Sequence, residues 1–240
     1  MDLTIVNELK DLLEQDSNIH AMWIAGSVAE GENDELSDVD LWVDIDDNQD
    51  RQVLNKIEQF LATKGTIDIN FSEGLMPPFT HVVYHLAQMN PLHFIEINLH
   101  SHSHKFGLFD SLRKIKVLFD KDDTTKFEPF DKASYNKMLS ERKQFLIEKI
   151  KFGESSVTKE IQRKQFMEAL HNYQFWLVEP IIELIRIKHS PLKITYGLKH
   201  GSRDLPKDAV AAIESLHIIS SLDDLNNKIK EVKELLKNYS

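Results

Sequence analysis

Hydrophobic residues follow two different periods along the chain, and the change of period divides it. In the first half, short alternating or apolar segments predict strands at residues 20–25, 39–45, 66–71, 80–87, 92–100 and 114–119. Helical spacing predicts helices over residues 2–15 and 48–64, the second of which ends at Gly65. Because only one of these helices lies between strands, we expect an α+β fold with a mixed sheet and flanking helices, not a doubly wound sheet.

Beyond about residue 130 the apolar positions recur at three and four residues, which indicates helices. The pattern predicts helices over residues 132–151, 156–188, 208–216 and 221–236, with a kink at Pro180 in the second. Ser221, followed by two acidic residues, is a good start for the last helix. We therefore expect two domains, with the sheet in residues 1–128 and a helical bundle in residues 129–240.

The stretch between the first two predicted strands carries the candidate chemistry. An apolar run ends at Gly26-Ser27, and a second strand begins after Ser37 with Asp38 and Asp40. Side chains two residues apart in a strand share a face, so the two carboxylates project together and call for a divalent cation such as Mg²⁺. Backbone N–H groups and the hydroxyl of the Gly26-Ser27 turn can face an anion. This layout predicts metal-assisted phosphoryl or nucleotidyl transfer.

The amino-acid composition limits the kinds of partner that the chain can bind. The 240 residues contain no cysteine, which excludes disulfides and thiolate metal sites, and the net charge is −10. An acidic chain is a poor binder of nucleic acid through its phosphates, whereas it suits metal ions and cationic small molecules, although solubility alone also accounts for the charge. No apolar stretch approaches the length that spans a bilayer, so we expect a cytoplasmic protein with no membrane partner.

The pattern GS-x-A-x-G, which begins at Gly26, is followed by SD-x-D-L, which begins at Ser37. In both motifs the chain resembles the DNA polymerase beta-like nucleotidyltransferase superfamily, and within it small bacterial aminoglycoside and lincosamide nucleotidyltransferases. The resemblance covers roughly the first 120 residues and is much weaker in the second half. It implies that a nucleoside triphosphate binds at Gly26-Ser27 and Ser37, and that two Mg²⁺ ions bind Asp38, Asp40 and a third carboxylate. An acceptor hydroxyl then attacks the α-phosphate, and pyrophosphate leaves.

The third carboxylate has two candidates, Glu96 and Asp68, each in the middle of a predicted strand. The family's third acid usually lies on the strand after the hairpin turn, which favours Glu96. The family more often has Asp at that position. Alternation alone also places either residue on a solvent-facing side of its strand, so a purely structural role stays open for both.

Three further groups carry weaker signals. Related antibiotic-modifying enzymes take the acceptor proton with a carboxylate of the bundle, for which Glu168 and Glu179 are candidates, and a solvated helix face is the alternative. Lys199 lies in a basic and aromatic segment that could contact the triphosphate, or it belongs to an ordinary surface loop. The remaining signals are alternating histidines and the acids that follow Asp40: His100, His102, His104, Asp44, Asp46 and Asp47. The histidines could bind a metal, but without a visible acid cluster we favour a strand end or pocket lining, and we interpret the acids as strand-end and turn residues.

The resulting hypothesis is an enzyme that moves AMP from ATP to a hydroxyl of a small molecule, with an antibiotic as the leading acceptor. Two alternatives stay open. One is transfer to a protein or an RNA partner, against which the negative charge counts. The other is a non-catalytic nucleotide-binding protein of the same fold, which the presence of Glu at the third acidic position keeps open. The sequence is also compatible with a homodimer.

Overall fold

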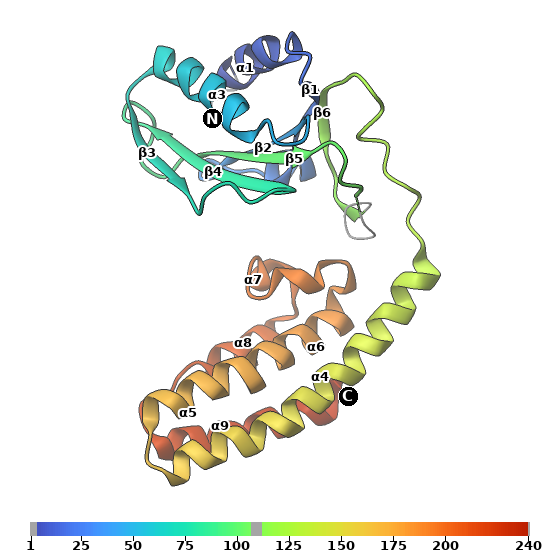
Figure 1. Ribbon diagram of the computed structural model, residues 1–240. Coiled ribbons are helices and arrows are strands. Elements are labelled where there is room, and N and C mark those ends of the chain that lie inside the picture. Colours follow the sequence, from blue (N-terminus) through green and yellow to red (C-terminus); the bar gives the residue numbers. More distant parts are fainter. Residues whose placement is uncertain (1–3, 107–111, 240) are drawn as a thin grey trace. The chain divides into compact units, whose positions relative to one another are not determined.

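The computed structural model describes residues 4–106 and 112–239. The chain forms two compact units, Met1–Phe130 and Asp131–Ser240, which we call the N-terminal and C-terminal domains (Figure 1). None of the helices in the described part of the chain combines the length and the apolar character needed to cross a membrane.

The N-terminal domain is built on a six-stranded mixed sheet in the order β3-β4-β5-β2-β1-β6. The central strands β2 and β5 are parallel, whereas all other neighbouring strands are antiparallel. All six predicted strands are present, and the expected mixed α+β sheet is confirmed. The strands span Ile19–Ile24 (β1), Val39–Ile45 (β2), Ile67–Ser72 (β3), Phe79–Leu86 (β4), Ile95–Ser101 (β5) and Lys116–Asp120 (β6).

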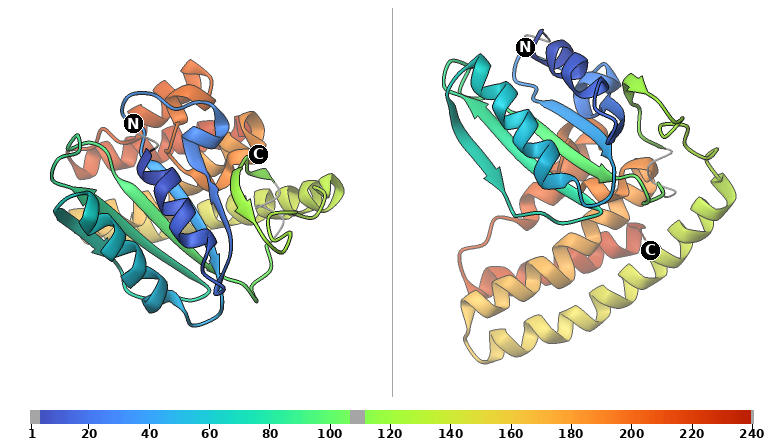
Figure 2. Two further views of the ribbon diagram at one scale, coloured as in Figure 1. Left: turned by 90° about the horizontal axis from the view of Figure 1, so that it is seen from above. Right: turned by 45° about the horizontal axis from the view of Figure 1, so that its top comes forward.

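Helices α1 (Thr4–Glu14) and α3 (Asp50–Lys64) cover one face of this sheet (Figures 1 and 2). Their apolar stripes pack on alternate residues of the two central strands to form one buried core, which includes Val39, Leu41 and Val43 of β2 and Ile95, Ile97 and Leu99 of β5. Alternation along a strand therefore turns Asp40 and Glu96 to the opposite face of the sheet. We call this the open face, because α1 and α3 do not cover it.

A short helix, α2 (Gly26–Glu30), stands where the sequence predicted a loop. It ends at Gly31, whose φ of 74° is left-handed and whose N–H donates to the carbonyl oxygen of Ser27. Five residues are too few for hydrophobic periodicity to reveal a helix, and none of the five is buried. The reason for the missed helix is therefore its length.

The elements in the described part of the C-terminal domain are all helical. Its apolar core joins α4, α5, α6, α8 and α9. Its elements are α4 (Lys132–Gln162), α5 (Phe166–Tyr173), a π-helical turn η2 (Gln174–Val178), α6 (Glu179–His189), a 3₁₀ segment η3 (Pro191–Tyr196), α7 (Gly201–Asp204), α8 (Lys207–Leu216) and α9 (Leu222–Tyr239).

The predicted break between residues 151 and 156 is wrong, because α4 continues without interruption to Gln162. Gly153, which lies within the predicted break, is buried and packs against the η2 segment. A Cβ at this position would lie 2.3 Å from the Cβ of Trp176. The glycine therefore permits close helix packing, and the chain reverses later, at Lys164, where φ is 60°.

The irregularity expected at Pro180 takes the form of the π-helical turn η2 directly before it. The N–H of Glu179 donates to the carbonyl oxygen of Gln174, five residues back. Proline has no N–H for a helical hydrogen bond, and a widened turn next to it is a common way for a helix to accommodate the missing bond.

We predict that Gly153→Ala lowers the free energy of unfolding by about 2 kcal/mol, because the added methyl group overpacks the contact with Trp176. Helix propensity alone predicts the opposite sign, a gain of about 1 kcal/mol. Urea unfolding measures the difference. The matched control is Ser155→Ala at an exposed position of the same helix, which should be neutral or slightly stabilising. Equal stability of the Gly153→Ala variant and the wild type would contradict the packing role.

Candidate active site

Asp40 and Glu96 lie side by side on the open face of the sheet. The parallel register of β2 and β5 pairs Asp40 with Glu96, one residue after the pair Val39 and Ile95. Both side chains are partly exposed, whereas the residues that flank them in each strand are buried in the core. The register of two buried strands therefore fixes the separation of the two carboxylates along the sheet.

Asp38 stands at the same end of the sheet. Its Oδ1 atom accepts a hydrogen bond of 2.7 Å from the backbone N–H of Phe94, the residue before β5. The N–H of Val39 in turn donates to the carbonyl oxygen of Phe94 at 3.1 Å. These two bonds join the starts of β2 and β5, so Asp38, Asp40 and Glu96 gather on the open face where these two strands begin.

The turn at Gly26 packs directly against Asp40. A Cβ at Gly26 would lie 1.8 Å from Oδ2 of Asp40, and the φ of this residue is 63°. The N–H of Ala25 also donates to the carbonyl oxygen of Asp40 at 2.9 Å. Only glycine combines this left-handed backbone with so close an approach, which is a physical reason for the glycine of the GS motif.

The two serines of the motif have different surroundings. Ser27 lies in the first turn of α2, and its backbone carbonyl oxygen also accepts from the N–H of Glu32 at 2.9 Å. The Ser37 hydroxyl accepts from the N–H of Asp34 at 2.9 Å and donates to Oδ1 of Asp34 at 3.0 Å. Ser37 thus shapes the loop that leads into Asp38.

Of the two candidates for the third acid, the structure brings Glu96 next to Asp40. Oε2 of Glu96 lies 3.2 Å from Nε2 of His81 on β4. Asp68 belongs to the edge strand β3, which β4 and β5 separate from β2. There Asp68 Oδ1 lies 2.6 Å from Nδ1 of His85, and this hydrogen bond raises the pKa of His85.

The three acids at this end of the strands offer carboxylate oxygens, which fit a hard divalent cation such as Mg²⁺. The three carboxylates are not drawn together to a common ligand distance. Among the described residues, the group of three whose ligand atoms all lie within 4.8 Å is a different one, made of His20, His102 and Asp122.

That second group lies at the opposite end of the sheet, near Asp44. Asp44 is fully buried, and its two oxygens lie 3.0 Å from Nδ1 of His100 and 2.7 Å from Nδ1 of His102. Burial acts to raise the pKa of Asp44, but the hydrogen bonds from the two histidines outweigh it and hold this pKa below its usual value. Asp44 is therefore a buried partner of the histidines rather than a simple strand-end acid.

Sequence reasoning missed His20 and Asp122. Nδ1 of His20 lies 2.5 Å from Oδ2 of Asp122, and Nε2 of His20 lies 2.9 Å from Oδ1 of Asp46. Burial acts to lower the pKa of His20, but these two carboxylates outweigh it and raise the pKa. His20 and Asp122 are 102 residues apart, so no local motif could have joined them.

The remaining predicted site residues, Glu168 and Lys199, belong to the C-terminal domain and are exposed. Glu168 lies in the first turn of α5, and Glu179, the other candidate base, is an exposed residue at the start of α6. Lys199 lies between η3 and α7, where its carbonyl oxygen accepts from Nη2 of the buried Arg186 at 2.6 Å. The roles of Glu168 and Lys199 stay predictions.

Comparison with solved structures gives distant likenesses. An aminoglycoside 6-adenyltransferase from Bacillus subtilis aligns at 12% identity and a TM-score of 0.43, over 98% of this chain and 87% of that one. A nucleotidyltransferase-like protein from Exiguobacterium sibiricum aligns at 9% and 0.41, over 97% and 75%. The GLD-2/RNP-8 complex aligns at 13% and 0.34, over 98% and 69%. At these identities and scores the likenesses say nothing about substrate.

Comparison by sequence is more direct, although no curated protein matches the chain. The model of the family described as "Polymerase beta, Nucleotidyltransferase" matches residues 7–88. This range runs from α1 to just beyond β4 and includes Gly26, Asp38 and Asp40, but it ends before Glu96. Residues 7–88 therefore match the nucleotidyltransferase domain of the polymerase beta family, which supports a nucleotidyltransferase.

Proposed function

We propose that the protein transfers AMP from ATP to a hydroxyl group of a small, cationic acceptor and releases pyrophosphate. The observation that carries the proposal is the register of Asp40 with Glu96, next to Asp38 and against the Gly26 turn. A set of carboxylates facing a glycine turn suits a nucleoside triphosphate with its divalent cations.

Nucleotidyltransferases of this fold use a nucleoside triphosphate and a divalent metal. We propose Mg²⁺ as the metal, with Asp38, Asp40 and Glu96 as its protein ligands. When bound, the cations stabilise charge on the attacking and leaving oxygens of the displacement at the α-phosphate. The carboxylates hold the cations at the edge of the open face, and Gly26 leaves room for the close approach of Asp40 to the turn.

The Gly26-Ser27 turn is the proposed seat of the triphosphate, because its backbone and hydroxyl groups follow directly on the end of β1. Ser37 supports this seat indirectly by holding the loop before Asp38. From the C-terminal domain we propose Glu168 as the base that takes the proton of the acceptor hydroxyl, and Lys199 as a contact to phosphate charge.

The acceptor is proposed from charge. With 39 acidic against 29 basic residues, the chain attracts cations and repels polyanions such as RNA. Next to the carboxylates, the open face presents Trp42, whose ring lies 6.0 Å from that of Phe79. A hydroxylated polycation such as an aminoglycoside suits this chain. Its positive charge complements the acidic surface, and its hydroxyl groups can accept AMP.

We predict that Asp38→Asn and Asp40→Asn each lower the rate of AMP transfer by more than about 100-fold, since even residues that only support metal ligands are often worth 10- to 100-fold. The melting temperature should stay unchanged or rise. Asparagine keeps the oxygen that accepts from Phe94, and it removes one of two neighbouring like charges. Pyrophosphate release and thermal unfolding measure the two effects. A wild-type rate in either variant would refute the proposed metal ligands.

A matched pair of variants tests the third acid. Glu96→Gln should be as damaging as Asp38→Asn, whereas Asp68→Asn on the edge strand should leave the rate within about threefold, because β4 and β5 separate it from the site. Both substitutions remove one carboxylate from a strand of the same sheet. If Asp68→Asn proves to be the inactive variant, the assignment of Glu96 is wrong.

Mass spectrometry of reaction mixtures tests the acceptor. We expect one AMP adduct on an aminoglycoside when the protein is incubated with ATP and Mg²⁺, and weaker transfer at higher salt because exposed charges are screened. Lincosamides, an RNA oligonucleotide and a protein acceptor complete the panel. Adducts on RNA or protein alone would overturn the acceptor while keeping the reaction. Binding of ATP, seen as a raised melting temperature, without any adduct would favour the non-catalytic alternative.

A further inference from the structure

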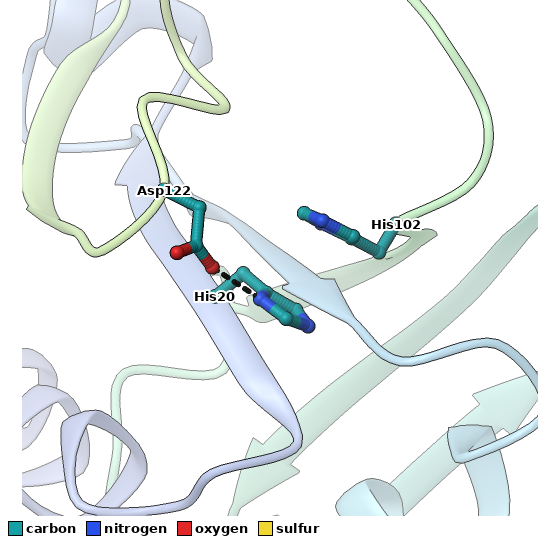
Figure 3. A group of neighbouring side chains, drawn as sticks. All are labelled: His20, His102 and Asp122. Atoms are coloured by element: carbon teal, nitrogen blue, oxygen red, sulfur yellow. Dashed lines mark hydrogen bonds and ion pairs between the residues drawn. The ribbon is translucent and has the colours of Figure 1, made fainter.

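A second cluster of metal-binding side chains lies at the end of the sheet opposite to the acids of the candidate active site. It consists of His20 on β1, His102 just after β5 and Asp122 just after β6, whose ligand atoms all lie within 4.8 Å of one another (Figure 3). His102 follows the end of β5 and lies six residues after Glu96, about 20 Å at the rise of a strand. The proposed nucleotidyl transfer therefore does not use this cluster.

The topology of the sheet brings these residues together. Strands β2 and β5 are parallel, and their C-terminal ends lie at the cluster. Strand β1 is antiparallel to β2, so it begins there. Strand β6 is antiparallel to β1, and its last residue, Asp120, pairs with Ala21 of β1. The three ligands thus come from three separate segments of the chain, one of which follows the edge strand β6.

Each histidine of the cluster has a carboxylate on its other ring nitrogen. Nδ1 of His102 lies 2.7 Å from Oδ2 of the buried Asp44, so Nε2 is the ring nitrogen that remains for a metal ion. Nε2 of His20 is engaged by Asp46 at 2.9 Å, and Nδ1 of His20 faces Asp122 at 2.5 Å. A carboxylate behind a metal-binding imidazole fixes the ring and raises its basicity, which is the usual arrangement at protein zinc sites.

Charge and packing also favour a cation here. The carboxylates of Asp44, Asp46 and Asp122 carry three negative charges around two imidazoles, and nearby Lys121 directs its ammonium group to the carbonyl oxygens of Asp16 and Ile19. The rings of His20 and His102 are stacked, with centroids 3.7 Å apart and planes inclined by 17°. A divalent ion bound between the rings and the carboxylates would neutralise part of this negative charge.

The ligand types select the metal. Two imidazole nitrogens and one carboxylate oxygen are ligands of Zn²⁺, while Mg²⁺ and Ca²⁺ take oxygen ligands. Zinc bonds of 2.0–2.2 Å in tetrahedral geometry separate the ligand atoms by about 3.4 Å. The side chains of His102 and Asp122 are 39% and 51% exposed. The same exposure gives the ion and a fourth, water ligand access from solvent.

We propose that His20, His102 and Asp122 form a zinc site that joins β1, the segment after β5 and the segment after β6. The ion ties the edge strand β6 to the centre of the sheet. Its role is structural, since the site lies away from the phosphate turn and its ligands hold three segments rather than a substrate.

Zinc binding to the full chain tests this proposal. Protein treated with chelator and dialysed is titrated with ZnCl₂ by calorimetry, and its thermal unfolding is followed with and without the metal. We expect one Zn²⁺ per chain and a melting temperature that rises with zinc concentration. Mg²⁺ at the same concentration should not compete for the site.

Two exposed ligands provide variants that should fold. His102→Ala and Asp122→Asn should each weaken zinc binding by at least about tenfold and abolish the shift in melting temperature. His104→Ala, an exposed histidine two residues from His102, is the matched control and should bind like the wild type. Asp38→Asn should also bind normally, which separates this site from the proposed catalytic one.

Unchanged zinc binding in both the His102→Ala and Asp122→Asn variants would overturn the assignment of the ligands. Absence of stoichiometric binding in the wild type would overturn the site itself. Loss of zinc binding in the His104→Ala or Asp38→Asn variant would show that the ion binds elsewhere and would overturn the proposed location.

Discussion

The parallel pairing of β2 with β5 is the constraint on which both candidate sites depend. Val39, Leu41 and Val43 bury one side of β2 under α1 and α3, and the same alternation holds along β5. A slip by one residue would turn every one of these apolar side chains toward the open face. The core therefore locks the register, and the register in turn sets Asp40 beside Glu96 and Asp44 beside His100.

The open face is organised into two polar ends with an aromatic middle. The first end holds carboxylates against the Gly26 turn, a set of hard oxygen ligands, whereas the second combines imidazoles with carboxylates. Between them, Trp42 stacks with Trp23 at a centroid distance of 5.9 Å. Because the ligand types differ, the two proposed sites favour different cations.

Glycine has two opposite uses in this chain. At Gly26 a left-handed backbone and the approach of Asp40 leave no room for a side chain, so the residue belongs to the candidate site. At Gly153 the helix is regular, and the absent side chain only lets Trp176 of the neighbouring segment approach. The sequence shows the same letter in both places. The predicted break between residues 151 and 156 failed because local pattern contains no information about a packing partner.

The sequence by itself determined the six strands, the mixed sheet, the helical second half and the grouping of Gly26 with Asp38 and Asp40. All of these follow from local periodicity or from spacings of a few residues. Only the tertiary structure decided which acid stands beside Asp40, since Glu96 and Asp68 have equivalent local patterns and differ in strand order. It alone joined His20, His102 and Asp122, because residues as many as 102 positions apart meet through the register of the sheet and not through any motif.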